Sequence, residues 1–368
     1  MSRDGPVSIA VIGTGEFATV LCRALATAGL PPASTVHVIG RTPGAAERVC
    51  AAADAAAGPV AVDAAAAFRP VHAEIGPTAD VRGLLARLRP GVVVLCASLQ
   101  SPAEFRGDGS RWAQLVRTAG FAVTLPLQAA LAAPVAAACA DVGGDRPVTF
   151  VNACFPDAVN PTLHARGLPV LCGLGNVASL AAAAGAALDL TDPARLKILA
   201  HHAHLHRPPH ERLEARWWVD DVPHADVGTL LEAARGSRGR LNNLGATVAA
   251  GMVRALAVGG EWTGHAPGPL GLPGGFPVEI RDGTLTLRLP PGVPLTAALA
   301  WTAEVSALDG ATVAPDGVVR LTDQARGALA AHLPGLPATF APQALPGLCT
   351  TLLELRERLR GQEPEESA

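Results

Sequence analysis

The chain has 368 residues, which is too long for one small core and suits two domains of ordinary size. Hydrophobic residues make up 49% of the chain and charged residues 17%, which excludes extensive disorder and favours a large core. The formal net charge of -3 provides no basic excess that would attract nucleic acid.

The first half of the chain alternates between strand and helix patterns. The run at 91–97 (GVVVLCA) is wholly apolar, which is typical of a parallel strand covered on both faces. Predicted strands cover residues 7–12, 35–39, 91–97, 148–152 and 169–173, and predicted helices cover 16–28, 43–57 and 114–140, the last broken near Pro126. This alternation predicts an α/β fold, with an N-terminal Rossmann-type doubly wound parallel sheet over residues 1–195.

The second half changes character and predicts a C-terminal α+β domain over residues 196–368, which we expect to hold a substrate. The pair Asp282-Gly283 lies between two alternating runs and favours a hairpin turn. Other predicted strands are 197–200 and 216–219, and predicted helices are 238–258, 295–308 and 343–360.

The seven cysteines form no C-x-x-C pair and most lie in apolar stretches, so we expect reduced, buried thiols. The apolar run near the N-terminus is short and leads into a glycine turn, which favours a strand over a signal peptide. Gly, Pro and Arg interrupt every apolar stretch before the length of about 20 residues that a membrane span needs. We therefore expect a cytoplasmic protein with neither membrane nor nucleic acid as a partner.

A glycine-rich loop follows the first predicted strand and opens the first predicted helix. Gly13 to Ala18 has the pattern G-x-G-x-x-A, in which the first glycine permits a tight turn and the second lets a pyrophosphate approach the backbone. The strand-loop-helix context is intact, so the loop predicts dinucleotide binding, although a tight turn in a fold that has lost its cofactor would look the same. The predicted cofactor-binding residues are Gly13, Gly15, Glu16, Phe17, Ala18, Arg41, Thr42 and Ala97.

The end of the second predicted strand bears on the choice of cofactor. A site selective for NAD usually has Asp or Glu there to bind the ribose 2′-hydroxyl, whereas this chain has Arg41 followed by Thr42. An arginine can bind a 2′-phosphate through charge-assisted hydrogen bonds, so we expect NADP to be preferred and NAD to remain possible. The alternative is a solvated arginine at the start of a helix.

Beyond the glycine loop, the order of motifs resembles the lactate/malate dehydrogenase superfamily over about residues 7–210. The segment after the strand at 91–97 resembles the mobile substrate loop, with Arg111 as the matching arginine; a helix-start surface arginine is the other interpretation. VTFVNACFPDAVNPTL resembles the strand that ends in a substrate-binding asparagine, which would be Asn152. KILAHHAHLH lies where the family carries its catalytic histidine, so the resemblance implies that His202 is the acid/base, with His204 in reserve.

The chain departs from the family on the helix after Asn176. That helix, GNVASLAAAAGAAL, lacks both the aspartate that orients the histidine and the arginine that binds the substrate carboxylate. Two alternatives therefore remain: a ketone or imine substrate that needs no such arginine, or loss of activity. We expect Asn176 to be a possible ligand contact at a strand end, and Asp157 and Asn160 to cap a helix.

Five histidines lie within ten residues, at 201, 202, 204, 206 and 210. On a strand, His202, His204 and His206 would share one face, where they could act on protons, bind zinc, or form only a polar turn. We favour the first and predict no metal. The sequence thus predicts an NAD(P)-dependent dehydrogenase or reductase that transfers hydride to or from a small carbonyl, hydroxy or imine substrate, and we expect a homo-oligomer. The alternative is a non-catalytic nucleotide-binding or assembly subunit with a dehydrogenase-like fold.

Overall fold

The computed structural model describes residues 5–58, 66–76, 78–105, 109–144, 147–205, 213–224 and 238–364. A six-stranded parallel sheet in the order β3-β2-β1-β4-β5-β6 organises the first half. This order is that of the Rossmann fold, so the predicted fold class is confirmed. The strands are β1 (Ser8–Ile12), β2 (Thr35–Gly40), β3 (Ala67–His72), β4 (Val92–Leu95), β5 (Thr149–Asn152) and β6 (Cys172–Gly173).

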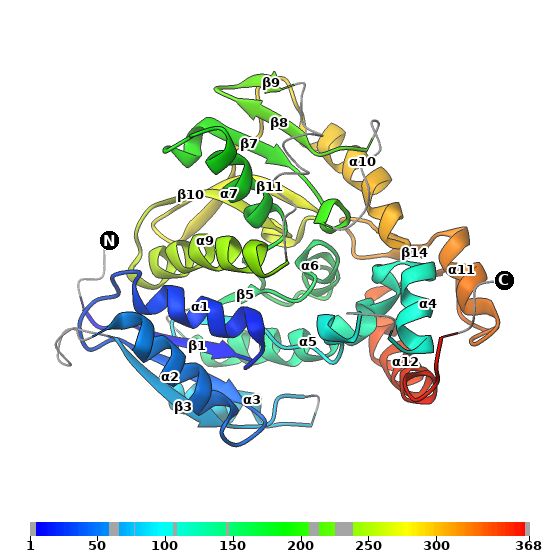
Figure 1. Cartoon of the computed structure of the whole chain (residues 1–368), viewed down its shortest axis with the longest axis horizontal. Coiled ribbons are helices and arrows are strands. Elements are labelled where there is room, and N and C mark those ends of the chain that lie inside the picture. Colours follow the sequence, from blue (N-terminus) through cyan, green and yellow to red (C-terminus); the bar gives the residue numbers. More distant parts are fainter. Residues whose placement is uncertain are drawn as a thin grey trace.

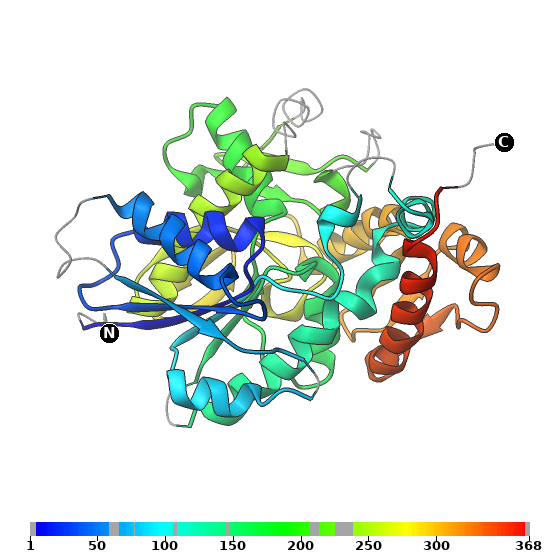
Figure 2. The same cartoon turned by 60° about the horizontal axis from the view of Figure 1, so that its bottom comes forward.

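Alternate residues of the central strands enter two different cores. Ile9 and Val11 of β1 pack beneath α1, α2 and α9, whereas Ala10 and Ile12 pack against α3 and α5. Side chains of a strand alternate between its faces, so the apolar runs reflect burial on both sides. Figure 2 shows the blue helices α1 and α2 on one side of the sheet and the cyan and teal helices on the other. The helices of this half are α1 (Glu16–Ala26), α2 (Ala45–Ala57), α3 (Val81–Leu88), α4 (Arg111–Ala119), α5 (Leu125–Val142), α6 (Pro156–Ala165) and α7 (Val177–Ala187).

Three antiparallel sheets and four helices follow in the described part of the second half. Figure 1 shows where α9, α10, α11 and α12 lie. The predicted hairpin is confirmed, with Asp282-Gly283 joining β11 to β12. The strands are β7 (Leu196–Leu199), β8 (Arg216–Val219), β9 (Val222–His224), β10 (Trp262–Pro267), β11 (Gly275–Arg281), β12 (Thr284–Leu287), β13 (Ala311–Val313), β14 (Val319–Leu321) and β15 (Thr339–Phe340). The helices are α9 (Arg238–Val258), α10 (Leu295–Ser306), α11 (Asp323–Ala330) and α12 (Leu345–Arg360). The domain boundary near residue 195 stays a prediction.

Short 3-10 helices connect several of these elements and carry part of the site. Two of them stand out, because η4 (His202–Leu205) holds the histidines and η6 (Ala307–Asp309) ends on a buried carboxylate. The others are η1 (Pro102–Phe105), η2 (Phe121–Thr124), η3 (Pro193–Arg195), η5 (Pro269–Gly271) and η7 (Pro342–Ala344).

A contact between two glycines joins the two halves of the chain. Gly120, between α4 and η2, has φ +98°, and Gly310, directly after η6, has φ +94°. A Cβ on Gly120 would overlap the backbone of Asp309, and one on Gly310 would overlap the carbonyl of Ala119. Only glycine satisfies both the positive φ and this close approach, and the contact places Asp309 beside η2.

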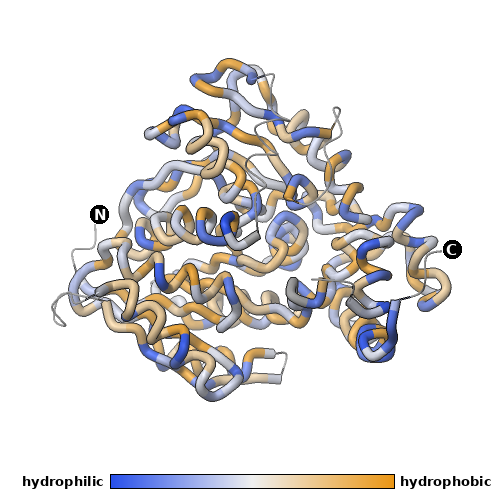
Figure 3. Tube along the Cα trace, viewed as in Figure 1, coloured by the Kyte–Doolittle hydropathy of each residue, from blue (hydrophilic) through white to orange (hydrophobic). Residues whose placement is uncertain are grey.

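Two described helical segments are long and apolar enough to cross a membrane. They are Phe121–Val142 and Gly239–Val258, and 72% and 61% of their apolar windows are buried inside the protein. Hydrophobic residues likewise concentrate along the inner strands and helices in Figure 3. The prediction that no stretch reaches this length was wrong, and burial of both helices in the core accounts for their composition.

Candidate functional site

The glycine loop has the shape that a dinucleotide requires. Gly13 has φ +127°, and a Cβ there would lie 2.8 Å from the backbone of Cys96, so the loop is held tightly against β4. Gly15 precedes the first turn of α1, and a Cβ on it would meet nothing within 4 Å. The open space therefore lies at the N-terminus of a helix, where backbone N–H groups and the helix dipole favour a phosphate. These residues fit a dinucleotide cofactor.

A cavity of about 660 Å³ extends from this loop to the histidine turn. It opens at the carboxyl ends of β1, β2 and β4, which is where open α/β sheets bind ligands. The predicted residues that line it are Gly13, Gly15, Glu16, Phe17, Arg41, Thr42, Ala97, Asn176 and His202. The structure thus brings the glycine loop, the end of β2 and one histidine to a single cavity.

Four other predicted residues lie outside this lining: Ala18, Arg111, Asn152 and His204. Ala18 is buried on α1 and packs against the sheet, as expected of the small third residue of the motif. Arg111 begins α4 and donates a hydrogen bond to Gln362 Oε1 at 3.2 Å. Asn152 is fully buried, and its amide binds the backbone of Cys154 and the side chain of Asn160. The substrate-contact roles of Arg111 and Asn152 stay predictions.

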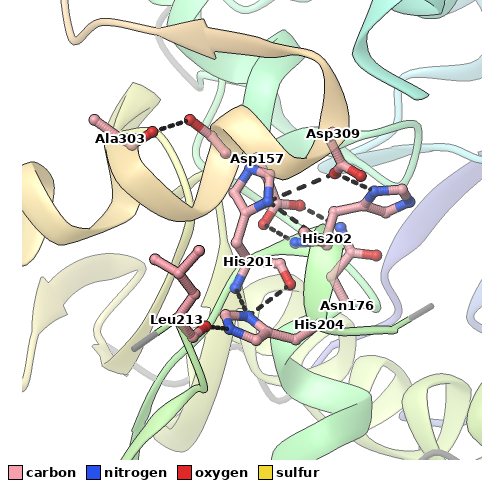
Figure 4. Close-up of polar contacts among 10 residues, drawn as sticks. Asp157, Asn176, His201, His202, His204, Leu213, Ala303 and Asp309 are labelled. Atoms are coloured by element: carbon pink, nitrogen blue, oxygen red, sulfur yellow. Dashed lines mark hydrogen bonds and ion pairs between the residues drawn. The ribbon is translucent and has the colours of Figure 1, made fainter. Parts of the chain in front are cut away.

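His202 is bound by a carboxylate that lies 107 residues later in the sequence. Its Nδ1 lies 2.8 Å from Oδ2 of Asp309, and the two side chains are 5% and 1% exposed as residues. The ring also stacks on Phe121, with ring centroids 4.7 Å apart, and meets Phe155 edge-on at 4.8 Å. Figure 4 shows Asp309 facing His202, with His201 close by. A carboxylate and two aromatic rings therefore fix one histidine at the edge of the cavity.

The histidine segment is a 3-10 helix, so the prediction of a strand over it was wrong. His202 N donates to Asp157 Oδ1 at 3.2 Å, and His204 N donates to the His201 carbonyl at 3.0 Å. These bonds close a tight turn directly after β7, and the turn sends the His202 and His204 side chains in different directions. His206 and His210 lie outside the described residues.

His204 has contacts that serve the loop rather than the cavity. Its Nδ1 accepts a hydrogen bond from His201 N at 2.9 Å, which leaves Nε2 as the protonated nitrogen. Nε2 donates to the Leu213 carbonyl at 2.6 Å, and the ring stacks on Trp301 with centroids 5.8 Å apart. Among the described residues, no group of three His, Cys, Asp or Glu side chains is placed to hold a metal ion.

Asp157 does not cap a helix; it holds His202 and Asn176 in place through hydrogen bonds. Phe155 occupies the cap position of α6, and Asp157 lies in the first helical turn, 1% exposed. Its carboxylate accepts hydrogen bonds from His202 N and from Asn176 Nδ2, which fixes the cavity-lining asparagine. Burial raises the pKa of Asp157 to about 7, although both hydrogen bonds oppose this shift. The predicted capping role was wrong for Asp157, and also for Asn160, which lies inside α6 and binds Asn152 and Gly268.

The cavity also contains two cysteines, whose thiols were predicted to be reduced and buried. Cys96 and Cys154 line it, and all seven cysteines of the chain are free. Burial raises the pKa of the Cys154 thiol to about 12 and that of Cys96 well above its usual value. Neither thiol is therefore a nucleophile at neutral pH.

Sequence reasoning missed Asp309, Phe121 and Gln128. Asp309 follows the mostly apolar segment 305–308 and is followed by a glycine, and an acid in such a run is a signal for a buried, paired carboxylate. The aromatic side chain and the glutamine lie in an apolar stretch that contains no recognised motif.

No protein-family model and no curated protein matches the sequence. Among solved structures, malate dehydrogenase from Plasmodium falciparum in complex with NADH superposes with a TM-score of 0.50 at 12% identity, covering 82% of this chain and 95% of that one. The chain has the malate dehydrogenase fold. Lactate dehydrogenase from Cryptosporidium parvum, solved with lactic acid and nicotinamide adenine dinucleotide, is 14% identical, covers 83% of this chain and 97% of its own, and has a TM-score of 0.48.

Within the malate dehydrogenase fold, the predicted resemblance is confirmed at the level of architecture. The departure seen in the sequence is also present in the structure, because α7 carries no charged side chain. The carboxylate that contacts His202 instead comes from η6, between α10 and β13.

Proposed function

We propose that the protein is a nicotinamide-dependent oxidoreductase that acts on a small carbonyl or imine substrate, or on the corresponding alcohol or amine. The observation that carries this proposal is the buried His202–Asp309 pair, in which His202 lines the same cavity as the glycine loop. A lone histidine in a core is common, but one that is bound by a buried carboxylate and also lines a ligand cavity has the arrangement of a positioned acid/base. The fold likeness to a malate dehydrogenase solved with NADH supports the cofactor class.

In this proposal, one group of residues binds the cofactor and another transfers the proton. The backbone around Gly13 and Gly15 would hold the pyrophosphate, and Arg41 with Thr42 would face the ribose at the end of β2. When bound, the nicotinamide supplies or accepts the hydride. The Asp309 carboxylate accepts a hydrogen bond from His202 Nδ1–H, which leaves Nε2 as the nitrogen that would exchange a proton with the substrate oxygen or nitrogen. The same carboxylate stabilises the imidazolium before it donates its proton.

Arg41 supports a preference for NADP over NAD. Its side chain is exposed and lines the cavity, and no acidic residue follows β2 within the next three positions. An arginine there would bind a 2′-phosphate through charge-assisted hydrogen bonds and would lose little with NAD. A homo-oligomer in the cytoplasm is part of this proposal on sequence grounds only.

The first experiment measures cofactor binding. Purified protein is titrated into NADPH and the fluorescence of the dihydronicotinamide is followed. Gly15→Val places a side chain where the pyrophosphate would lie and should abolish binding. Gly335→Val is the matched control, because a Cβ there also meets nothing within 4 Å and the residue is exposed outside the cavity. Equal binding by both variants would remove the cofactor assignment.

The second experiment tests the proton donor. NADPH oxidation is measured with a panel of small ketones and imines, first with the wild type and then with His202→Asn. We expect turnover to fall by about 10²- to 10⁴-fold, with NADPH affinity unchanged, because a positioned acid contributes on that scale. His332→Asn, two residues after the end of α11 and outside the cavity lining, is the control. Unchanged turnover in His202→Asn would favour the non-catalytic nucleotide-binding subunit instead.

A further inference from the structure

The part of the cavity around His202 is largely apolar. Phe121 and Phe155 contact the His202 ring, and Leu131 and Leu205 line the same cavity. Such walls bury a small ligand but do not by themselves orient it, so the polar groups among them decide which ligand fits.

Gln128 and Ser179 are the two buried polar side chains among the described lining residues for which the fold provides no hydrogen bond, and Gln128 is the larger. It lies on α5, is 3% exposed, and shares a helix face with Leu131, three residues later. Within the described part of the chain, its amide makes no hydrogen bond. The amide faces the cavity and is not among the fully enclosed polar atoms that lack a partner, so solvent in the cavity reaches it and a bound ligand can take the place of that solvent.

A second glutamine in the same lining provides the contrast. Gln100 is fully buried too, but its Oε1 accepts a hydrogen bond from Trp112 Nε1 at 2.9 Å. Its Nε2 donates to Glu104 Oε2 at 2.7 Å and to the Ser101 carbonyl. Gln100 is therefore a structural residue, whereas Gln128 has the capacity to bind a ligand.

The charge of the cavity lining bears on the charge of the ligand that it could bind. Arg41 is the one arginine or lysine among the described residues that line the cavity, and it lies beside the glycine loop. A buried carboxylate ligand needs a cation or several donors in contact with it. The amide of Gln128 instead offers one acceptor and two donors and matches another amide edge to edge.

We propose that Gln128 orients a neutral substrate whose reacting carbonyl adjoins a carboxamide, so that the substrate class is 2-oxo amides and 2-hydroxy amides rather than 2-oxo acids. This inference rests on the proposed function. In the reductive direction, the keto carbon accepts a hydride from the reduced nicotinamide and the keto oxygen takes a proton from His202. The C=O π bond is lost, a C–H and an O–H bond form, the amide stays intact, and the nicotinamide is oxidised.

The test compares substrates that differ only in charge. Rates of NADPH oxidation are measured with pyruvamide and pyruvate, and calorimetry measures the binding of lactamide and lactate to the protein saturated with NADPH. We expect kcat/KM to favour pyruvamide by at least about 10-fold, and lactamide to bind more tightly than lactate by a similar factor. A preference for pyruvate or lactate in either assay would overturn the proposal.

Substitutions then assign the preference to one residue. Gln128→Leu should remove the preference for the amide, and Gln128→Arg should shift it towards pyruvate, with the dissociation constant of NADPH unchanged in both. Gln324→Leu, which alters an exposed glutamine on α11, is the control. If Gln128→Leu unfolds, Gln128→Asn shortens the side chain by one methylene and should weaken lactamide binding in the same direction. Undiminished lactamide binding in the folded variants would refute the role of Gln128.

The outcomes separate this inference from the proposed function. Lactamide binding that depends on Gln128, without turnover of any substrate, would refute the oxidoreductase and support the ligand assignment. Turnover that favours pyruvate would support the oxidoreductase and refute the amide assignment. Failure to bind NADPH or lactamide would refute both.

Discussion

Asp309→Asn tests how His202 is positioned without changing the size of either side chain. The carboxylate accepts from Nδ1 at 2.8 Å and is 1% exposed, so the bond is a buried, charge-assisted one. Such a bond contributes about 1.5–3 kcal/mol, and each 1.4 kcal/mol corresponds to a factor of ten in rate. We therefore expect kcat/KM to fall by about 10- to 150-fold. An asparagine that turned its NH₂ group towards the ring would also favour the wrong tautomer and give the larger loss.

The assay is the pH dependence of kcat/KM for carbonyl reduction. The donor must be protonated, and loss of the carboxylate destabilises the imidazolium, so the fall in rate with rising pH should begin at a lower pH in the variant. Cofactor affinity should not change, because Asp309 does not line the described cavity. His201→Asn is the comparison, since His201 Nδ1 lies farther from the carboxylate, at 3.6 Å, and a loss of only a few-fold is expected. A normal rate and pH profile in Asp309→Asn would refute the positioning argument.

Three further outcomes follow from the contacts described. Arg41→Asp should weaken NADPH binding by about 10- to 150-fold with little effect on NADH, measured by fluorescence titration, because one charge-assisted contact is lost; equal effects on both cofactors would place Arg41 away from the 2′ position. Burial raises the folded-state pKa of Asp157 to about 7 from 3.8, so its contribution to stability is present in full below pH 3.8 and is lost as the pH rises through 7. Denaturant unfolding between pH 5 and 8 should therefore show a decline in the wild type that Asp157→Asn lacks, and parallel profiles would contradict the raised pKa. Gly120→Ala should lower the free energy of unfolding by more than about 1 kcal/mol, because a Cβ would strain a positive φ and overlap the Asp309 backbone, whereas Gly335→Ala should not lower it.

The sequence was a good guide where burial on both faces imposes a pattern. The central strands β1, β2 and β4 are short apolar runs, and they were predicted to within about two residues at each end. The strand β3 was missed because it is an edge strand, which can carry Arg69 and Pro70 and remain partly exposed. The helix α3 has only eight residues, including a glycine, and such a short segment has a weak period.

The part of the site that was predicted consists of residues that are close together in the sequence. The glycine loop is a local motif, so its geometry followed from consecutive residues. The prediction of His202 depended on the order of motifs along the chain, whereas its partner Asp309 lies 107 residues away and no spacing rule connects them. The strand predicted over the histidines failed because a buried carboxylate, Asp157, captures the backbone N–H of His202 and turns the chain.

The contact of Gly120 with Gly310 brings Asp309 to a cavity whose lining comes from an earlier part of the chain. Every described residue that lines the cavity lies at or before Asn242, whereas the carboxylate that aligns the acid arrives with the segment after α10. Changes at η6 can therefore alter the rate of turnover while the residues that line the cavity stay the same.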